Sequence, residues 1–128
     1  MKNNNTDLRP VFLDLLRIRQ PITAIASIAH RVSGVLLVLS LPAVIWLLDR
    51  SLRSPESYAQ VVEQLGTPWA KALVLAVAWA AAHHFFAGIR FLLLDFDIGV
   101  ELETATKSAY GVIIAGALGL LLALVVVL

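Results

Sequence analysis

The stretch ALVLAVAWAAAHHFFAGI, residues 72–89, contains no formally charged residue and is followed directly by Arg90. A transmembrane helix needs about 20 mostly apolar residues, a length that this run reaches once its flanks are included. The ionisable side chains in the run are those of His83 and His84. A titratable ring at membrane depth is costly and requires a partner. The run therefore predicts a membrane helix that carries a functional site.

Two further uncharged runs extend this pattern over the whole chain, at residues 32–48 and 108–128. The chain has 128 residues, of which 59% are hydrophobic, more than the interior of a water-soluble domain of this size holds. We expect an all-α integral membrane protein with three transmembrane helices at about 22–48, 69–94 and 108–128. They form one membrane-anchor domain over residues 1–128.

Three segments are expected outside the membrane. Apolar residues at helical spacing predict a short N-terminal amphipathic helix, namely Leu8, Val11, Phe12, Leu15 and Leu16. Residues 56–65 are expected to form a short surface helix, and residues 95–107 an acidic loop. Because charged residues interrupt the N-terminal region, we do not expect a signal peptide there.

The distribution of Lys and Arg predicts the orientation in the membrane. Seven of the ten lie in or near the N-terminal segment and the 95–107 loop, and three lie between the first two membrane helices. The N-terminus is therefore expected on the cytoplasmic side and the C-terminus on the opposite side.

Composition excludes several chemistries from this chain. The absence of cysteine excludes thiolate ligation of an iron–sulfur cluster, covalent CxxCH haem attachment and disulfides. The glycines form no GxGxxG fingerprint. A net charge of +1 without a basic cluster argues against nucleic acid. Flavin or nicotinamide chemistry, if the protein serves it, must belong to another subunit.

His84 is the first candidate for a site. Ala80 and Gly88 lie one turn to either side on the same helix face. Small residues there leave a flat slot in which a porphyrin fits, and a neutral imidazole is a common axial ligand of haem iron. The alternative is that the small residues only allow close helix packing, with His84 hydrogen-bonded across the bundle. His83 is rotated by about 100° and is expected to face another helix or subunit.

A polar stripe on the first membrane helix is the second candidate. Ser27, His30, Arg31 and Gly34 follow i, i+3, i+4, i+7 spacing. A charge at the depth of Arg31 requires a partner, such as a haem propionate or the carbonyl of a bound quinone. The alternative is that Arg31 only extends to the membrane interface.

Depth along the helices relates the two candidates. His30 and His84 are at similar levels if each residue rises about 1.5 Å. Either both ligate one haem within the chain, or His84 and a partner chain ligate it while His30 contacts a propionate. Asp95 and Glu101 are candidates for a proton relay to a quinone. The alternative for them is a solvated loop with an Arg90–Asp95 ion pair.

Two segments of the chain resemble the cytochrome b556 membrane-anchor subunits of bacterial succinate dehydrogenase, respiratory complex II. The first is RPVFLDLLRIRQPITAIASIAHRVSGV at residues 9–35. The second is HFFAGIRFLLLDF at residues 84–96, which fits H-x-x-x-G-x-R-x-x-x-x-D. Their order, their spacing and the three-helix length also agree. Family members often carry a second histidine after the motif arginine; here Phe91 occupies that position, so no role transfers to it.

The resemblance implies a haem b- and quinone-binding anchor for a flavoprotein subunit and an iron–sulfur subunit. Electrons would pass from succinate to ubiquinone at the bacterial inner membrane, with the C-terminus in the periplasm. His84 would ligate the haem iron, and a second membrane-anchor subunit would supply the other ligand. Ser27 and Arg31 would bind the quinone, and His30 and Arg31 would lie near the propionates.

Three other functions remain compatible with these residues. One is the anchor of a quinol:fumarate reductase. Another is a structural membrane subunit whose haem is not on the electron path. The third is a small transporter or channel subunit in which Arg31 and the histidines form a relay.

Overall fold

The computed structural model describes residues 18–128 as four α-helices. They are α1 (Ile22–Ser51), α2 (Pro55–Leu65), α3 (Pro68–Asp95) and α4 (Leu102–Val127). Helices α1, α3 and α4 are long and apolar enough to cross a membrane. This confirms the all-α class and the three membrane helices. The predicted N-terminal amphipathic helix, Leu8 to Leu16, lies outside the described residues.

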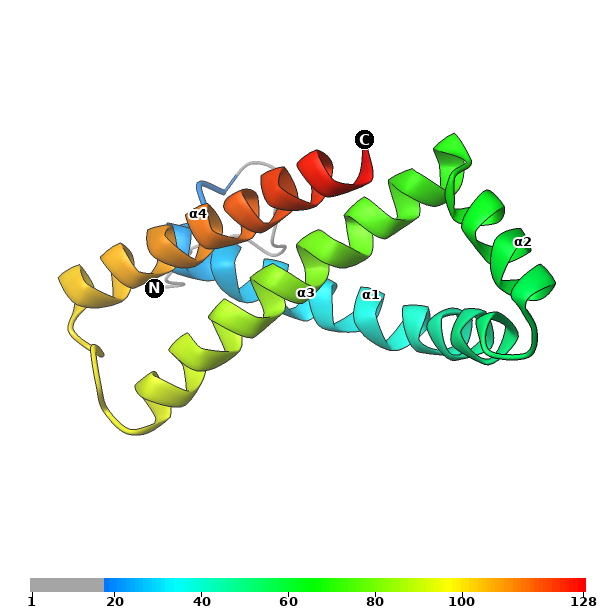
Figure 1. Cartoon of the computed structure of the whole chain (residues 1–128). Coiled ribbons are helices and arrows are strands. Elements are labelled where there is room, and N and C mark those ends of the chain that lie inside the picture. Colours follow the sequence, from blue (N-terminus) through cyan, green and yellow to red (C-terminus); the bar gives the residue numbers. More distant parts are fainter. Residues whose placement is uncertain (1–17) are drawn as a thin grey trace, which may run out of the picture.

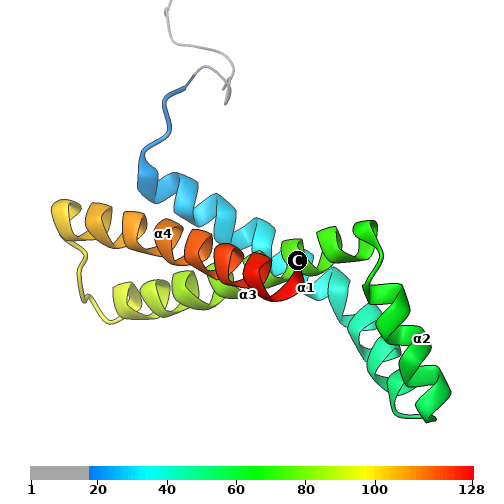
Figure 2. The same ribbon diagram turned by 45° about the horizontal axis from the view of Figure 1, so that its top comes forward.

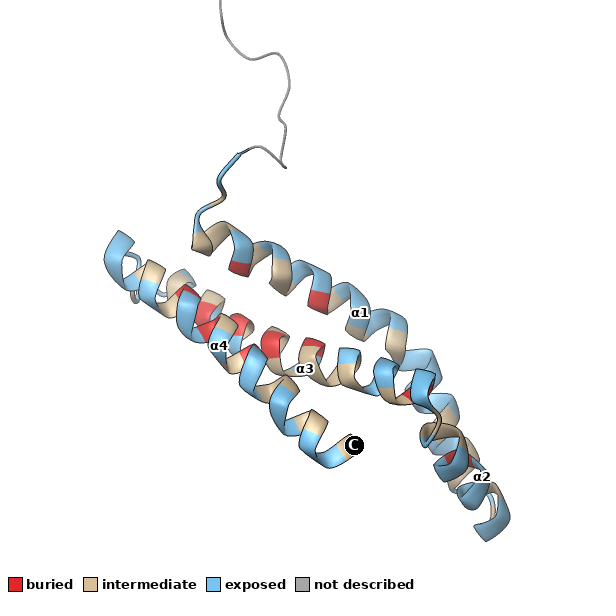
Figure 3. Ribbon diagram, turned by 90° about the horizontal axis from the view of Figure 1, so that it is seen from above, coloured by how far each residue is buried: buried red, intermediate tan, exposed pale blue. Residues whose placement is uncertain are grey.

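Helix α3 lies between the other two long helices. Figure 1 shows α1 crossing α3, while α4 runs beside α3 in the opposite direction. The view in Figure 3 places α1 on one side of α3 and α4 on the other. Side chains of α3 therefore lie in two different interfaces, depending on the direction in which they point.

Small residues make these interfaces. Ala80, Ala87 and Ala109 are buried, whereas large apolar side chains such as Leu39 and Val125 are exposed. A Cβ on Gly119 would come within 2.4 Å of the Ala82 Cβ, so the α3–α4 approach requires glycine there. Close contact through small residues is typical of membrane helices.

Helix α4 begins earlier than the sequence predicted. Its first residue is Leu102 rather than residue 108, so the expected 95–107 loop is wrong over its second half. Lys107 and Glu103 form an i,i+4 ion pair of 2.6 Å on the two added turns. Hydropathy does not reveal a polar helix end that lies in water. Ion pairs between residues i and i+4, such as Glu103–Lys107, stabilise such a helix end. The remaining turn reverses the chain with positive φ at Asp97 and Gly99, 58° and 77°.

The predicted surface helix at 56–65 is confirmed as α2, which projects from the bundle in Figure 2. Ser54 and Ser57 form a reciprocal capping box at its start, and Pro55 occupies the first turn. The Ser57 hydroxyl also donates to the Arg50 carbonyl at 2.8 Å. The Arg50 guanidinium donates to the Gln60 side chain at 2.7 Å. These bonds attach α2 to the end of α1.

Candidate functional site

His30 of α1 and His84 of α3 meet where the two helices cross. Their rings are stacked with centroids 4.1 Å apart and planes 11° apart. Phe91 packs against the His30 ring, with centroids 5.0 Å apart. The structure thus brings together two of the sequence-predicted site residues from segments far apart in the chain.

The hydrogen bonds of His84 define its tautomer. Its Nδ1 lies 3.1 Å from the backbone carbonyl oxygen of His30. A carbonyl oxygen only accepts hydrogen bonds, so Nδ1 must carry the proton and donate it. In a neutral imidazole with this tautomer, the Nε2 atom keeps its lone pair. A neutral imidazole with Nδ1–H bound to a backbone carbonyl is the usual form of a metal-ligating histidine.

Glycine 34 makes room for the His84 ring. A Cβ on Gly34 would lie 3.0 Å from the Cε1 atom of His84. On α3, Gly88 faces His30: a Cβ added to Gly88 would lie 3.9 Å from the Nε2 atom of His30. Ala80 is completely buried. The sequence placed Gly34 in the polar stripe but did not identify it as the residue against which His84 packs.

The stacked rings of His30 and His84 are in direct contact. Parallel rings at 4.1 Å are in van der Waals contact, which leaves no space for a porphyrin between them.

Ser27 and Arg31 lie on the same helix but face the surroundings of the chain. Ser27 is half-buried and Arg31 is exposed. Arg31 lines a shallow cavity of about 250 Å³ with Val32, Val35 and Leu36. Any ligand held by Arg31 would therefore be covered on its other side by another molecule.

The turn between α3 and α4, which Asp95 and Glu101 flank, lies at the end of the bundle where α1 begins (Figure 1). Both are exposed; Asp95 is the last residue of α3 and Glu101 precedes α4. They stand at the surface on the same side as Ser27, which is near the start of α1.

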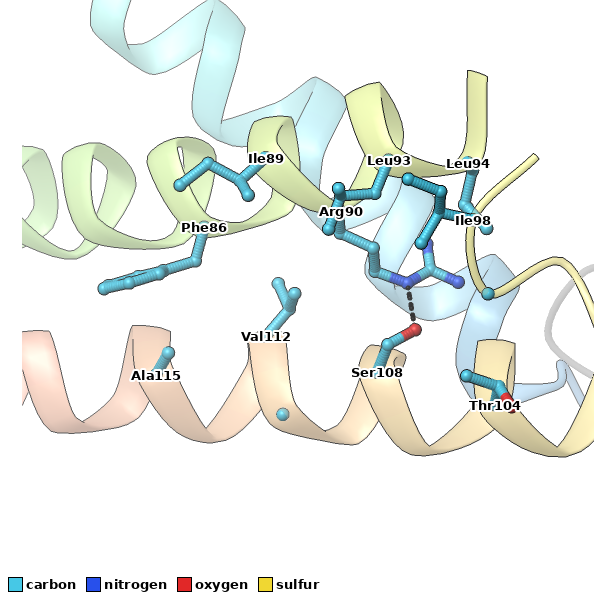
Figure 4. Close-up of a pocket in the computed structure, with 12 residues that line it drawn as sticks. Phe86, Ile89, Arg90, Leu93, Leu94, Ile98, Thr104, Ser108, Val112 and Ala115 are labelled. Carbon is cyan, nitrogen blue, oxygen red and sulfur yellow. Dashed lines mark hydrogen bonds between the residues drawn. The ribbon is translucent and has the colours of Figure 1, made fainter. Parts of the chain in front are cut away.

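The alternative of an Arg90–Asp95 ion pair is wrong. Arg90 is only 7% exposed and turns towards α4. Its Nε donates to the Ser108 hydroxyl at 2.9 Å, as Figure 4 shows, and its Nη2 donates to the Ala105 carbonyl at 3.1 Å. It borders a cavity of about 300 Å³ between α3 and α4. The sequence suggested Asp95 because it follows on the same helix; packing places Ser108 nearer.

His83 points in a different direction from His84, as predicted, and its ring lies between α4 and the Ala26 backbone of α1. It is 2% exposed and stacks on Trp79, with ring centroids 5.5 Å apart. On the α4 side it packs so closely that a Cβ on Gly116 would lie 3.0 Å from its Nδ1. His83 is therefore a packing residue.

Sequence reasoning missed Ser33. Its side chain is fully buried between α1 and α3, and its Oγ lies 3.3 Å from the Nδ1 of His84. The available signal was a serine three residues after His30 within an apolar helix. Identifying it required knowledge of the α1 face that α3 covers.

Fold and site together define an integral membrane protein with three long apolar helices and two stacked histidine rings, those of His30 and His84, at a helix crossing. The family described as succinate dehydrogenase/fumarate reductase transmembrane subunit matches residues 5–125. The chain belongs to this family.

Individual relatives agree with this assignment. The chain is 37% identical over 116 residues to the succinate dehydrogenase cytochrome b556 subunit of Coxiella burnetii, covering 90% of this chain and 93% of the relative. It is 32% identical over 127 residues to the subunit of that name from Paracoccus denitrificans, covering 98% and 97%. It is 29% identical over 84 residues to a succinate dehydrogenase hydrophobic membrane anchor subunit of Archaeoglobus fulgidus, covering 66% and 72%.

Proposed function

We propose that this chain is the haem b- and quinone-binding membrane anchor of a succinate dehydrogenase. It holds the flavoprotein and iron–sulfur subunits at the bacterial inner membrane and helps pass electrons from succinate to ubiquinone. The N-terminus faces the cytoplasm and the C-terminus the periplasm, in agreement with the Lys and Arg distribution.

The observation that carries the haem assignment is the bond from the His84 Nδ1 to the His30 carbonyl, 3.1 Å long. It fixes the ring and leaves the Nε2 lone pair for an iron ion. When bound, haem b supplies a one-electron carrier at this depth of the membrane. A partner anchor subunit would supply the other protein ligand, since the ring of His30 lies against that of His84.

Ser27 and Arg31 are the proposed contacts of the quinone. Arg31 provides a fixed positive charge that stabilises negative charge developing on a quinone oxygen, and the Ser27 hydroxyl donates a hydrogen bond. The cavity beside Arg31 is otherwise lined by Val32, Val35 and Leu36, which suit an apolar tail. Arg31 and His30 also lie on the helix that would approach the haem propionates.

Proton delivery is assigned to Asp95 and Glu101. Both carboxylates are exposed at the end of the bundle nearest to Ser27. They can take protons from water and pass them towards a quinone held at that end. The proposed role makes no use of Arg90, because its guanidinium bonds to Ser108 and Ala105.

The haem proposal is tested by purifying the complex through a tag on this chain. We expect the flavoprotein and iron–sulfur subunits to co-purify and a reduced-minus-oxidised difference spectrum of b type. A complex without Soret absorbance contradicts the haem assignment. Such a result, with no partner subunits recovered, is what a transporter or channel subunit would give.

The quinone proposal is tested with Arg31→Leu. We expect quinone reduction by succinate to fall at least tenfold while succinate oxidation by an artificial dye is retained, because dye reduction bypasses the membrane site. The control is Arg53→Leu, which removes an exposed arginine after the other end of α1. Unchanged quinone kinetics in Arg31→Leu contradict the assignment.

A fumarate reductase anchor is the second candidate, since the description of the family includes both enzymes. It is distinguished by the direction of electron flow in the purified complex, measured with succinate and ubiquinone and with fumarate and a low-potential quinol. A third possibility, haem as a purely structural element, requires that a complex lacking haem still reduces quinone at the normal rate.

A further inference from the structure

Ser33 is a buried polar residue without a role in the function proposed above. It is 0% exposed, on the face of α1 that α3 covers. Three atoms converge there: the Ser33 Oγ, the His30 carbonyl oxygen and the His84 Nδ1. The Oγ is 2.8 Å from the carbonyl oxygen and 3.3 Å from Nδ1, and the carbonyl oxygen is 3.1 Å from Nδ1.

The three distances permit one arrangement of protons. The Ser33 hydroxyl has one proton, which it donates to the His30 carbonyl at 2.8 Å. The lone pairs of its oxygen then face the Nδ1–H of His84. The Nδ1–H accordingly has two acceptors, the carbonyl at 3.1 Å and the serine oxygen at 3.3 Å. Two acceptors from different directions restrict rotation of the imidazole more than one does.

We propose that Ser33 is a positioning residue for His84, which holds the plane of the ring and lowers the reduction potential of the haem that the ring ligates. This rests on the proposed function, in which the His84 Nε2 binds iron. Hydrogen bonds from Nδ1–H to an acceptor make the imidazole a more basic ligand. A more basic ligand stabilises oxidised iron and so lowers the potential.

Removing the serine oxygen has two effects of opposite sign on the reduction potential of the haem. The His84 ring loses one acceptor, which raises the potential. The His30 carbonyl loses a competing donor and accepts more strongly from Nδ1, which partly offsets the rise. We expect the loss of the acceptor to prevail, with a net change of about threefold in the ratio of oxidised to reduced haem at fixed ambient potential. At 59 mV per tenfold change for one electron, this is about +28 mV.

The test compares Ser33→Ala with Ser40→Ala in the purified complex. The chain offers this matched control because Ser40 also donates to the carbonyl three residues earlier in α1, at the same 2.8 Å. Both variants lose that local bond, and Ser33→Ala also loses the contact with His84. The measurements are the haem midpoint potential by optical titration and the g values of the oxidised haem, which report the orientation of the ligand plane.

We expect a raised potential and shifted g values in Ser33→Ala, with wild-type values in Ser40→Ala. Ser33→Cys keeps a weak acceptor, so its haem potential should lie between those of the wild type and Ser33→Ala. If the Ser33→Ala protein does not assemble, Ser33→Cys takes its place in the test. Wild-type values in the Ser33 variants, or equal shifts in Ser40→Ala, overturn the inference. A wild-type complex without haem overturns the proposed function itself, which is a separate outcome.

Discussion

His83 and His84 are neighbours in the chain, yet they have different surroundings. His83 packs against Gly116 of α4, is 2% exposed, and its ring also lies close to the Ala26 backbone of α1. His84 points towards α1, is half-buried, and its Nδ1 is bonded to the His30 carbonyl. One step along a helix turns the side chain by about 100°, which gives the two rings different surroundings. Identical residue types thus become a packing element and a candidate ligand.

The largest effect expected from this difference is on haem binding. His84→Phe should abolish the b-type difference spectrum, because phenylalanine has no nitrogen for iron. His83→Phe should retain the spectrum, since phenylalanine keeps an aromatic ring in the space between Trp79 and Gly116. The measurement is haem content per assembled complex. Loss of haem in His83→Phe, with assembly intact, would show that the two histidines are not separated as described.

The next effect concerns the space around His84. In Gly34→Ala the new Cβ would lie 3.0 Å from the His84 Cε1, so the ring must move away from its carbonyl partner. We expect haem to be retained about tenfold less tightly, as for other changes that disturb ligand support. Gly111→Ala in α4 is the control, because nothing lies within 4 Å of its new Cβ. Equal haem retention in both variants would contradict the proposed position of the ring.

The smallest effect is on stability at the His83 interface. In Gly116→Ala the new Cβ would lie 3.0 Å from the His83 Nδ1 and 3.1 Å from its Cβ. Overpacking of this kind costs about 1–3 kcal/mol. Gly111→Ala, in the same helix with nothing within 4 Å, should be neutral or slightly stabilising. Thermal denaturation of the complex in detergent measures the difference. A Gly116→Ala protein as stable as Gly111→Ala would mean that His83 is loosely packed.

The three membrane helices were predictable because the bilayer imposes a simple rule. A backbone that crosses it must satisfy its own hydrogen bonds, so an apolar run of sufficient length becomes a helix. The predicted ends at residues 48 and 94 lie within three residues of the observed Ser51 and Asp95. The start of α4 was wrong by six residues because its first turns lie in a polar segment, where hydropathy carries no information.

The site was predictable only in part. Residue type and depth were sufficient to select His84, since an ionisable ring within the membrane requires a partner. They did not identify Ser33 or the position of Gly34 against the ring, because both depend on which face of α1 meets α3. The Arg90–Asp95 pair failed for a related reason: Ser108 lies 18 residues further along the chain but across the α3–α4 interface.

The sequence by itself determined that this protein crosses the membrane three times and that His83 and His84 face different directions, since both follow from hydropathy and helical periodicity. Only the tertiary structure decided which nitrogen of His84 keeps its lone pair. That depends on an oxygen of another helix, the His30 carbonyl, lying 3.1 Å from Nδ1. Every residue has the same backbone carbonyl, so the sequence does not indicate which carbonyl a distant side chain will contact. Helix packing alone determines that contact.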